Sequence, residues 1–360
     1  MIAPALTPYT AVLLIPTGIG CAIGGYAGDA LPVARVLGQA VDCLITHPNV
    51  LNGAQLYWPI PNALYVEGYA LDRFAAGDWN LQPVCQNRIG LILDAGIEPD
   101  LRLRHLQAAE ATRATLGLHL TDYVTTDRPL EVCLGRSSTG ASWGQVTHLD
   151  SLLRAAETLL TQTKAEAIAV VARFPDDGGS EALQDYRQGR GVDPLAGAEA
   201  VISHAIVRAF QIPCAHAPAL QPLPLDPTLS PRSAAEEIGY TFLPCVLAGL
   251  SRAPRFHAPR LQTSHPAVSG LHTAGVNVVI TPASACGGSA LLHWAAQGKT
   301  IVAVEENTTT LSVYPESLGI SVLRVQSYLE AIGVVISDRA GVDAQRLRSS
   351  ISLLKDLHFS

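Results

Sequence analysis

Apolar residues along this chain occur in short runs that are separated by longer amphipathic segments. Residues 11–16, 89–94 and 167–174 are such runs, rich in Val, Ile, Leu and Ala. Short apolar runs are typical of buried strands, and segments with apolar residues three and four positions apart are typical of helices. Their alternation predicts an α/β fold with mainly parallel sheets and crossover helices.

The pattern assigns an element to most of the chain. Strands are expected at residues 11–16, 42–46, 89–94, 167–174, 276–281, 300–304 and 320–325. Helices are expected at residues 31–41, 99–116, 149–163, 195–210, 287–297, 326–336 and 343–356. Prolines break the alternation at 218–230 and 252–266, which predicts loops there. Because 360 residues exceed the usual size of one core, we expect two domains, at 1–140 and 141–360, or alternatively one large α/β domain with insertions.

The charge and composition of the chain limit the kinds of partner that the protein is expected to bind. Lys and Arg number 24 against 31 Asp and Glu, and the basic residues are scattered along the chain. This distribution argues against a nucleic-acid partner, which would need a basic patch. Only 15% of the residues are charged, and so little charge favours a homo-oligomer that buries part of its surface.

The cysteines and the N-terminal residues indicate in which cellular compartment the protein is expected. The seven cysteines form an odd set, mostly in or beside apolar runs, as free thiols in a reducing compartment do. No apolar run reaches the roughly 18 residues of a membrane span. The first residues, Met1-Ile2-Ala3-Pro4, lack the basic start of a signal peptide. These features predict a cytoplasmic protein with no membrane partner.

The strongest site candidate is the turn Ser284-Ala285-Cys286-Gly287-Gly288-Ser289, between a strand and a helix. In parallel sheets, ligands bind beyond the carboxyl ends of the strands. Gly287 and Gly288 allow a ligand to approach the backbone, and Ser284, Ser289 and the helix start attract an anion. The alternative is a tight turn in which Ser289 caps the helix. At the helix start, Cys286 is expected to form a reactive thiolate, unless it only packs.

Two neighbouring segments offer further ligand contacts. Glu305 and Asn307 follow the strand at 300–304 and supply a carboxylate and an amide, either to a site or to a hydrogen-bonded turn. The loop at residues 17–29 follows the first strand, and its candidate ligand-binding residues are Gly18, Gly20, Gly24 and Gly25. Its spacing matches neither dinucleotide nor Walker loops. It predicts a backbone cradle for a ligand or, alternatively, closely packed backbone.

Three side chains complete the candidate set. His47 follows the second strand and is an acid/base candidate, the alternative being a histidine bonded to loop carbonyls. Asp94 follows the third strand, and Arg173 near the end of another suits a carboxylate or phosphate. No short paired Cys or His spacing indicates a metal, and the sequence leaves the cofactor unknown.

With these motifs in view, the chain resembles an uncharacterised family known chiefly from photosynthetic microbes. The resemblance rests on Pro16-Thr17-Gly18-Ile19-Gly20, His47-Pro48-Asn49 and Cys286-Gly287-Gly288-Ser289, and it implies no activity. A more distant likeness is to the C-terminal half of two-domain nucleotide-sugar glycosyltransferases, carried by Gly287-Gly288-Ser289 and Gly298-Lys299. The helix at 291–296 lacks the carboxylate that holds ribose in that family. Cys21 and Cys286 also resemble the paired cysteines of some racemases and lyases.

Together these features favour an enzyme, a lyase, isomerase or transferase, acting on a small anionic metabolite. The Gly-rich segments would hold its phosphate or carboxylate, and Cys286, Glu305 or His47 would carry out acid/base or thiol chemistry. One alternative is a nucleotide-sugar glycosyltransferase. The other is a non-catalytic protein that binds or senses a metabolite with the same loops.

Overall fold

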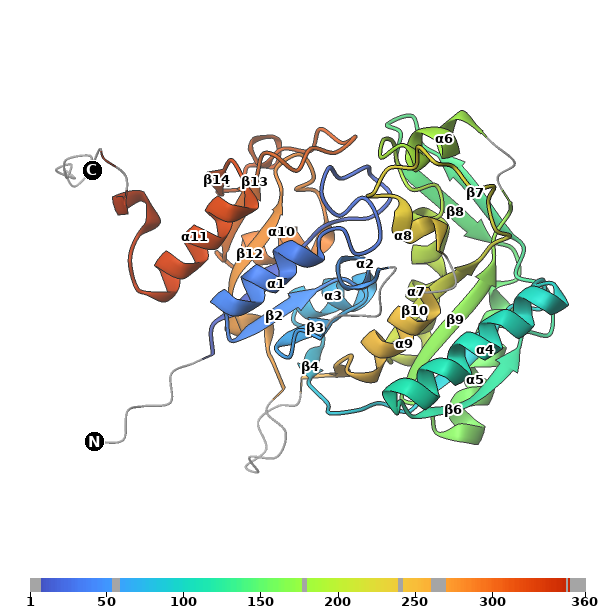
Figure 1. Ribbon diagram of the computed structural model, residues 1–360. Helices are drawn as coiled ribbons and strands as arrows, with labels where there is room; N and C mark the ends of the chain where they lie inside the picture. Colours follow the sequence, from blue (N-terminus) through green and yellow to red (C-terminus); the bar gives the residue numbers. More distant parts are fainter. Residues whose placement is uncertain are drawn as a thin grey trace, which may run out of the picture.

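The computed structural model describes residues 8–53, 59–176, 180–238, 242–259, 270–347 and 349 of the 360-residue chain. Two parallel sheets lie side by side (Figure 1), which confirms the predicted α/β class with mainly parallel sheets. Buried residues of both sheets, among them Ala11 and Leu91, belong to one hydrophobic cluster. The sheets therefore share a core.

The six-stranded sheet combines the two ends of the chain. Its order is β14-β13-β12-β1-β2-β3, and every neighbouring pair is parallel. The strands are β1 (Thr10–Leu13), β2 (Cys43–Thr46), β3 (Ala63–Tyr65), β12 (Val276–Pro282), β13 (Thr300–Val304) and β14 (Leu323–Val325). In the middle of this sheet, Leu13 at the end of β1 is level with Thr46 and Ile280. The loops after β1, β2, β12 and β13 therefore emerge at one edge.

The four-stranded sheet comes from the middle of the chain and has the order β10-β9-β5-β6, again parallel throughout. Its strands are β5 (Ile89–Leu93), β6 (Leu120–Thr125), β9 (Ala167–Arg173) and β10 (Cys214–Ala219). Two small antiparallel pairs join β4 (Asn80–Gln82) to β11 (Arg255–His257), and β7 (Val132–Arg136) to β8 (Ser142–Val146).

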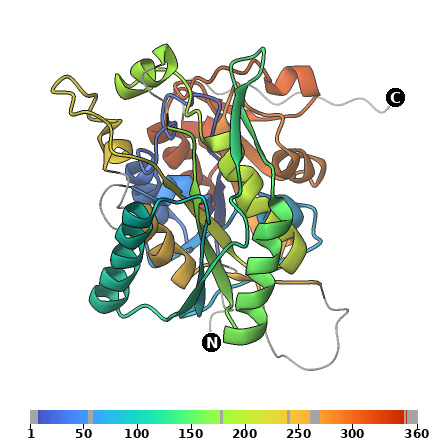
Figure 2. The ribbon, with the colours of Figure 1, turned by 90° about the vertical axis from the view of Figure 1, so that its right-hand side faces the viewer.

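Helices cover both faces of each sheet. They are α1 (Leu31–Ala40), α2 (Pro48–Leu51), α3 (Gly68–Ala75), α4 (Pro99–Leu116), α5 (Leu149–Thr163), α6 (Glu181–Arg187), α7 (Ala196–Phe210), α8 (Ala234–Glu237), α9 (Phe242–Ser251), α10 (Ser289–Ala296) and α11 (Tyr328–Arg339). In Figure 2, α4 and α5 flank the four-stranded sheet on opposite sides. Helix α3 belongs to the six-stranded sheet and packs against α7 of the other. This contact joins the two halves of the molecule.

The sheets do not follow the expected division at residue 140. Residues 89–219 supply the four-stranded sheet, whereas strands before and after this segment form the six-stranded one. Parallel strands need a long crossover, and here the crossover from β3 to β12 contains the whole second sheet. The predicted helix at 343–356 is described only at its start, where Ala344–Leu347 forms a 3-10 turn, and most of it lies outside the described residues.

Candidate functional site

Two adjoining cavities lie beside the ends of the strands, the smaller one between the two sheets and the larger one beside the four-stranded sheet. The smaller holds about 70 Å³ and is lined by residues from the ends of β2 and β3, from α7 and from β10. The larger holds about 500 Å³ and lies under α6 and the segment that follows β10. Five residues line both cavities: Asp193, Leu195, Pro218, Glu236 and Phe242. We name the smaller cavity the histidine pocket, because His47, His204 and His216 line it.

A histidine–carboxylate pair forms one wall of the histidine pocket. Glu67 follows β3, is 3% exposed, and accepts hydrogen bonds from the backbone N–H groups of Tyr69 and Ala70 at the start of α3. Its other oxygen, Oε1, lies 2.8 Å from Nε2 of His204 on α7. Burial lowers the pKa of His204, but the hydrogen bond and charge of Glu67 outweigh it, so the net shift is upward. His204 is therefore biased toward the imidazolium form.

His47, which the sequence singles out, lines the same pocket. Its Nδ1 accepts a hydrogen bond from the backbone N–H of Asn49, which leaves the proton of the neutral ring on Nε2. A Cβ atom built on Gly68 would lie 3.1 Å from Nε2 of His204 and 3.8 Å from Nε2 of His47. The two rings thus approach the same glycine. Burial, together with the charges of His204 and His216, lowers the pKa of His47 to about 3. His47 is a neutral hydrogen-bond donor here.

Carboxylates form the opposite wall. Nε2 of His216 lies 3.5 Å from Glu199 Oε2. Glu236 accepts hydrogen bonds from the backbone N–H of Ala27 and from the hydroxyl of Tyr186. Burial, and then the negative charges of Glu199 and Asp29, raise the pKa of Glu236 to about 7. A carboxyl group with such a pKa can accept or release a proton at neutral pH.

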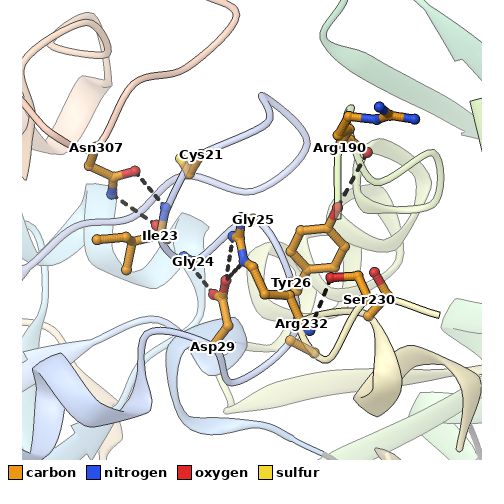
Figure 3. A network of polar contacts seen from close by, with 12 residues as sticks. Cys21, Ile23, Gly24, Gly25, Tyr26, Asp29, Arg190, Ser230, Arg232 and Asn307 are labelled. Carbon is orange, nitrogen blue, oxygen red and sulfur yellow. Dashed lines mark hydrogen bonds and ion pairs between the residues drawn. The ribbon is translucent and has the colours of Figure 1, made fainter. Parts of the chain in front are cut away.

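The Gly-rich loop at residues 17–29 ties the two halves of the molecule together (Figure 3). Asp29 accepts hydrogen bonds from the backbone N–H of Gly24 and from the guanidinium of Arg232, at 2.6 Å for its NH2 group. Arg232 lies over the ring of Tyr26, which stacks on Tyr186 with ring centroids 4.5 Å apart. This network connects a loop that follows a strand of the six-stranded sheet to residues of the other half of the molecule.

The glycines of that loop pack against protein atoms. A Cβ on Gly18 would lie 2.4 Å from Ser142 Oγ, and one on Gly20 would lie 3.1 Å from the carbonyl oxygen of Gly191. At Gly24 the added atom would lie 2.3 Å from Ile15, just before the loop, and at Gly25 it would lie 2.3 Å from the carbonyl oxygen of Cys21 within the loop. Of the described loop residues, Thr17 and Ala27 line the histidine pocket, whereas these four glycines line neither cavity. The alternative of closely packed backbone fits them best.

The inner part of the turn at residues 284–289 is occupied by other parts of the protein, whereas Gly288 is open, since a Cβ there would meet no atom within 4 Å. Helix α10 begins at Ser289, and the backbone N–H of Ala290 donates to Oδ1 of Asp72 at 2.9 Å. Ser284 Oγ lies 2.9 Å from Thr309 Oγ1, and a Cβ on Gly287 would lie 3.0 Å from Val313. Gly288 is the N-cap residue, so the alternative in which Ser289 caps the helix is wrong. An internal carboxylate holds the position where an anionic ligand was expected, and none of the described residues 284–289 lines either cavity.

The expected thiolate at Cys286 is wrong as well. The side chain is fully buried, and its Sγ lies within reach of the carbonyl oxygens of Pro282 and Ala283. Burial, only partly offset by the positive charge of Arg324, raises the pKa of Cys286 to about 11. The desolvation of the thiolate outweighs the effect of the helix start. Cys286 is a packing residue.

Alkylation of the native protein tests this description. Cys85 and Cys133 are exposed, whereas Cys21, Cys214 and Cys286 are buried. We expect iodoacetamide at neutral pH to label Cys85 and Cys133, and to leave Cys286 unlabelled until the protein is denatured, as followed by peptide mass spectrometry. Rapid labelling of native Cys286 would contradict its assignment as a packing residue.

The other expected site residues form structural contacts outside the two cavities. Glu305 pairs with Arg324. Asn307 is fully buried and bonds to both the N–H and the carbonyl of Ile23 (Figure 3). Asp94 accepts the backbone N–H groups of Gly96, Leu130 and Arg173. The guanidinium of Arg173 pairs with Glu98 and Asp176, so its positive charge is already balanced by carboxylates of the protein.

Several residues of the histidine pocket were missed from sequence. Glu67 lies two residues after the end of β3, close to the position that identified His47, but β3 has only three residues and is hard to recognise in the sequence. Ser203 and His204 interrupt an otherwise apolar stretch of α7, and this interruption was the available signal for His204. Within the described part of the chain, no group of three or more His, Cys, Asp or Glu side chains is arranged to hold a metal ion.

Comparison with known proteins gives a family and corrects the predicted location. A protein from Synechococcus sp. named "Uncharacterized lipoprotein" is 61% identical over 351 residues, which is 98% of this chain and 96% of that protein. Its name contradicts the expected cytoplasmic location, which we therefore withdraw. No helix in the described residues has the length and apolar character to cross a membrane. No solved structure matches the chain. The family model described as "Protein of unknown function (DUF3326)" matches residues 10–348, and the chain belongs to this family.

Proposed function

We propose that this protein is an enzyme that catalyses proton transfer in the histidine pocket. The observation that carries the proposal is the His204–Glu67 pair at 2.8 Å in a pocket that Glu236 also lines. The pair favours a protonated imidazole, and Glu236 has a pKa of about 7. Groups whose environments shift their pKa values within one pocket are typical of acid/base sites.

The surroundings suggest a role for each residue. The carboxylate of Glu236 removes a proton from the substrate, and the imidazolium of His204 donates one to a second atom. Glu67 orients His204 and favours its charged form. His47 donates a hydrogen bond from Nε2 to a developing negative charge. One proton leaves the substrate and another arrives, so the proposed reaction is an isomerisation or, if a group departs, a reversible elimination in which the abstracted proton exchanges with solvent.

The charges of the pocket argue against the anionic metabolite expected from the sequence. Four carboxyl groups line it (Glu67, Asp193, Glu199 and Glu236), and among its described lining side chains only histidines could carry a positive charge. Two of these, His204 and His216, already lie beside Glu67 and Glu199. A phosphate or carboxylate would meet repulsion without a free cation to balance it. We therefore propose acid/base chemistry on a ligand that is not anionic.

The nucleotide-sugar alternative gains no support from the site. It requires a diphosphate near the start of α10, where Asp72 accepts the N–H of Ala290. A phosphate there would have to displace this carboxylate. The alternative of a non-catalytic binding protein differs from the proposed enzyme in one measurable outcome. A binding protein releases its ligand chemically unchanged, whereas the proposed enzyme alters or labels it. The predicted homo-oligomer remains a prediction.

Solvent hydrogen exchange tests the proposal without knowledge of the substrate. The protein is incubated in D2O with a metabolite extract of Synechococcus, the source of the 61% identical relative. We expect deuterium in at least one metabolite, because a base that removes a carbon-bound proton exchanges it with solvent. The label is read by mass spectrometry. Labelling that is absent, or equal with a Glu236→Gln variant, would refute the proposal.

A further inference from the structure

We propose that the 500 Å³ cavity binds the apolar body of an uncharged organic substrate whose reactive end enters the histidine pocket. This inference rests on the proposed function for the reactive end and names the substrate class of that site. A volume of 500 Å³ lies in the range of cavities that enclose a drug-sized molecule.

The walls of the cavity are largely apolar. Leucines line it from β7, from α6, from the start of α7 and from the segment after β10, and Phe242 of α9 closes one side. Prolines 175, 194, 218, 222 and 224 supply much of the remaining surface. Burial of apolar ligand surface against such walls is favourable by about 25 cal/mol per Å². The body of the ligand is therefore apolar.

Arg187 and Asp176 of the cavity wall each form an ion pair with another side chain of the protein. Arg187 is 6% exposed and donates to both oxygens of Glu237, at 2.7 and 3.1 Å, and to the carbonyl oxygen of Pro224. Asp176 pairs with Arg173 behind the wall. Among the described lining residues, no guanidinium or ammonium group other than that of Arg187 is present. An anionic ligand would have to break the Arg187–Glu237 pair, at the cost of leaving a carboxylate unpaired.

The junction of the two cavities also excludes negative charge. Asp193 and Glu236 stand where the cavities meet, together with the apolar side chains of Leu195, Pro218 and Phe242. Burial, and then the charges of Glu199 and Glu236, raise the pKa of Asp193 well above its usual range. Asp193 Oδ1 accepts the backbone N–H of Leu195, and the carboxyl group, when it is protonated, can donate a hydrogen bond to a carbonyl or hydroxyl oxygen. An uncharged hydrogen-bonding group therefore suits the polar end of the ligand.

Two fluorescent probes of similar size test the charge of the ligand. Prodan is an uncharged naphthalene ketone, and anilinonaphthalene sulfonate has a comparable aromatic body with a fixed negative charge. We expect prodan to bind the native protein with a blue-shifted emission, and the sulfonate to bind at least about tenfold more weakly. Absence of prodan binding, or equal or tighter binding of the sulfonate, would overturn the inference.

Substitutions locate the bound probe. Leu183 of α6 and Leu223 line the cavity, whereas Leu225, two positions further along the chain, is fully exposed. We expect Leu183→Trp and Leu223→Trp each to weaken prodan binding at least about tenfold by filling the cavity, and Leu225→Trp to leave it unchanged. If all three variants bind prodan equally well, the probe lies elsewhere and the inference fails.

These measurements separate the inference from the proposed function. Prodan binding depends on the walls of the cavity and requires no proton transfer. If Leu223→Trp loses prodan while the protein labels no metabolite in D2O, the cavity binds an apolar ligand and the enzymatic proposal fails. If labelling occurs but only in anionic metabolites, the enzymatic proposal stands and the substrate class named here is wrong.

Discussion

Substitution of His204 by asparagine is expected to reduce the rate of the labelling reaction by about 100- to 10,000-fold, the usual contribution of one general acid or base. The imidazole is the proton donor of the proposed reaction, and an asparagine side chain cannot donate a proton at neutral pH. The ring is partly exposed, with 43% of the side chain accessible, so its loss has a small effect on packing. The measurement is the initial rate of deuterium incorporation into the labelled metabolite.

A second histidine provides the matched control. His293 lies on the exposed side of α10, outside both cavities, with its Nδ1 beside the carbonyl oxygen of Ser289. We expect His293→Asn to retain the native rate. A rate for His204→Asn within about threefold of the native value would exclude His204 as the donor, since its expected contribution is about 100-fold or more.

The role of Glu67 appears in the pH profile. Because Glu67 raises the pKa of His204, the donor stays protonated to a higher pH, and activity is lost as the pH rises through this raised pKa. In Glu67→Gln an amide replaces the charge but retains an oxygen for the N–H groups of Tyr69 and Ala70. We expect this variant to lose activity at a lower pH than the native protein. An unchanged alkaline limb would show that Glu67 only caps α3.

Substitution of Gly28 by alanine is expected to reduce the free energy of unfolding by about 2–5 kcal/mol. Gly28 has a φ of +75°, which costs an alanine about 1–2 kcal/mol. An added Cβ would lie 1.8 Å from the carbonyl oxygen of Asn52 and 2.9 Å from the Cα of Gly53. These are backbone atoms, so relief requires movement of the chain beside the histidine pocket, and overpacking typically adds about 1–3 kcal/mol or more. The measurement is equilibrium urea unfolding.

Gly319 separates the two contributions to this effect. Its φ is +66°, and a Cβ there would meet no atom within 4 Å. Gly319→Ala therefore carries the cost of the backbone angle alone, about 1–2 kcal/mol. If the two variants have the same midpoint and the same dependence on urea, the close approach of Gly28 to Asn52 contributes nothing to stability.

The sequence alone determined the class of the fold and the position of its long elements. Helices at Pro99–Leu116 and Leu149–Thr163 were predicted to the residue. The first has proline at its start and Gly117 at its end with a φ of +66°, and both are local signals that require no knowledge of distant contacts. His47 was found in the same way, because it directly follows an apolar strand.

Only the tertiary structure decided which strands are neighbours and which side chains meet. Hydrophobic periodicity indicates which face of an element is buried, but not what buries it. Hence the pairing of β1 with β12, across most of the chain, did not follow from the pattern. Gly18, Gly20 and Arg173 had plausible ligand chemistry, yet each meets a residue that is distant in the sequence, namely Ser142, Gly191 and Glu98. Glu67 and His204 form a pair because α3 packs on α7, a long-range contact that neither local segment encodes.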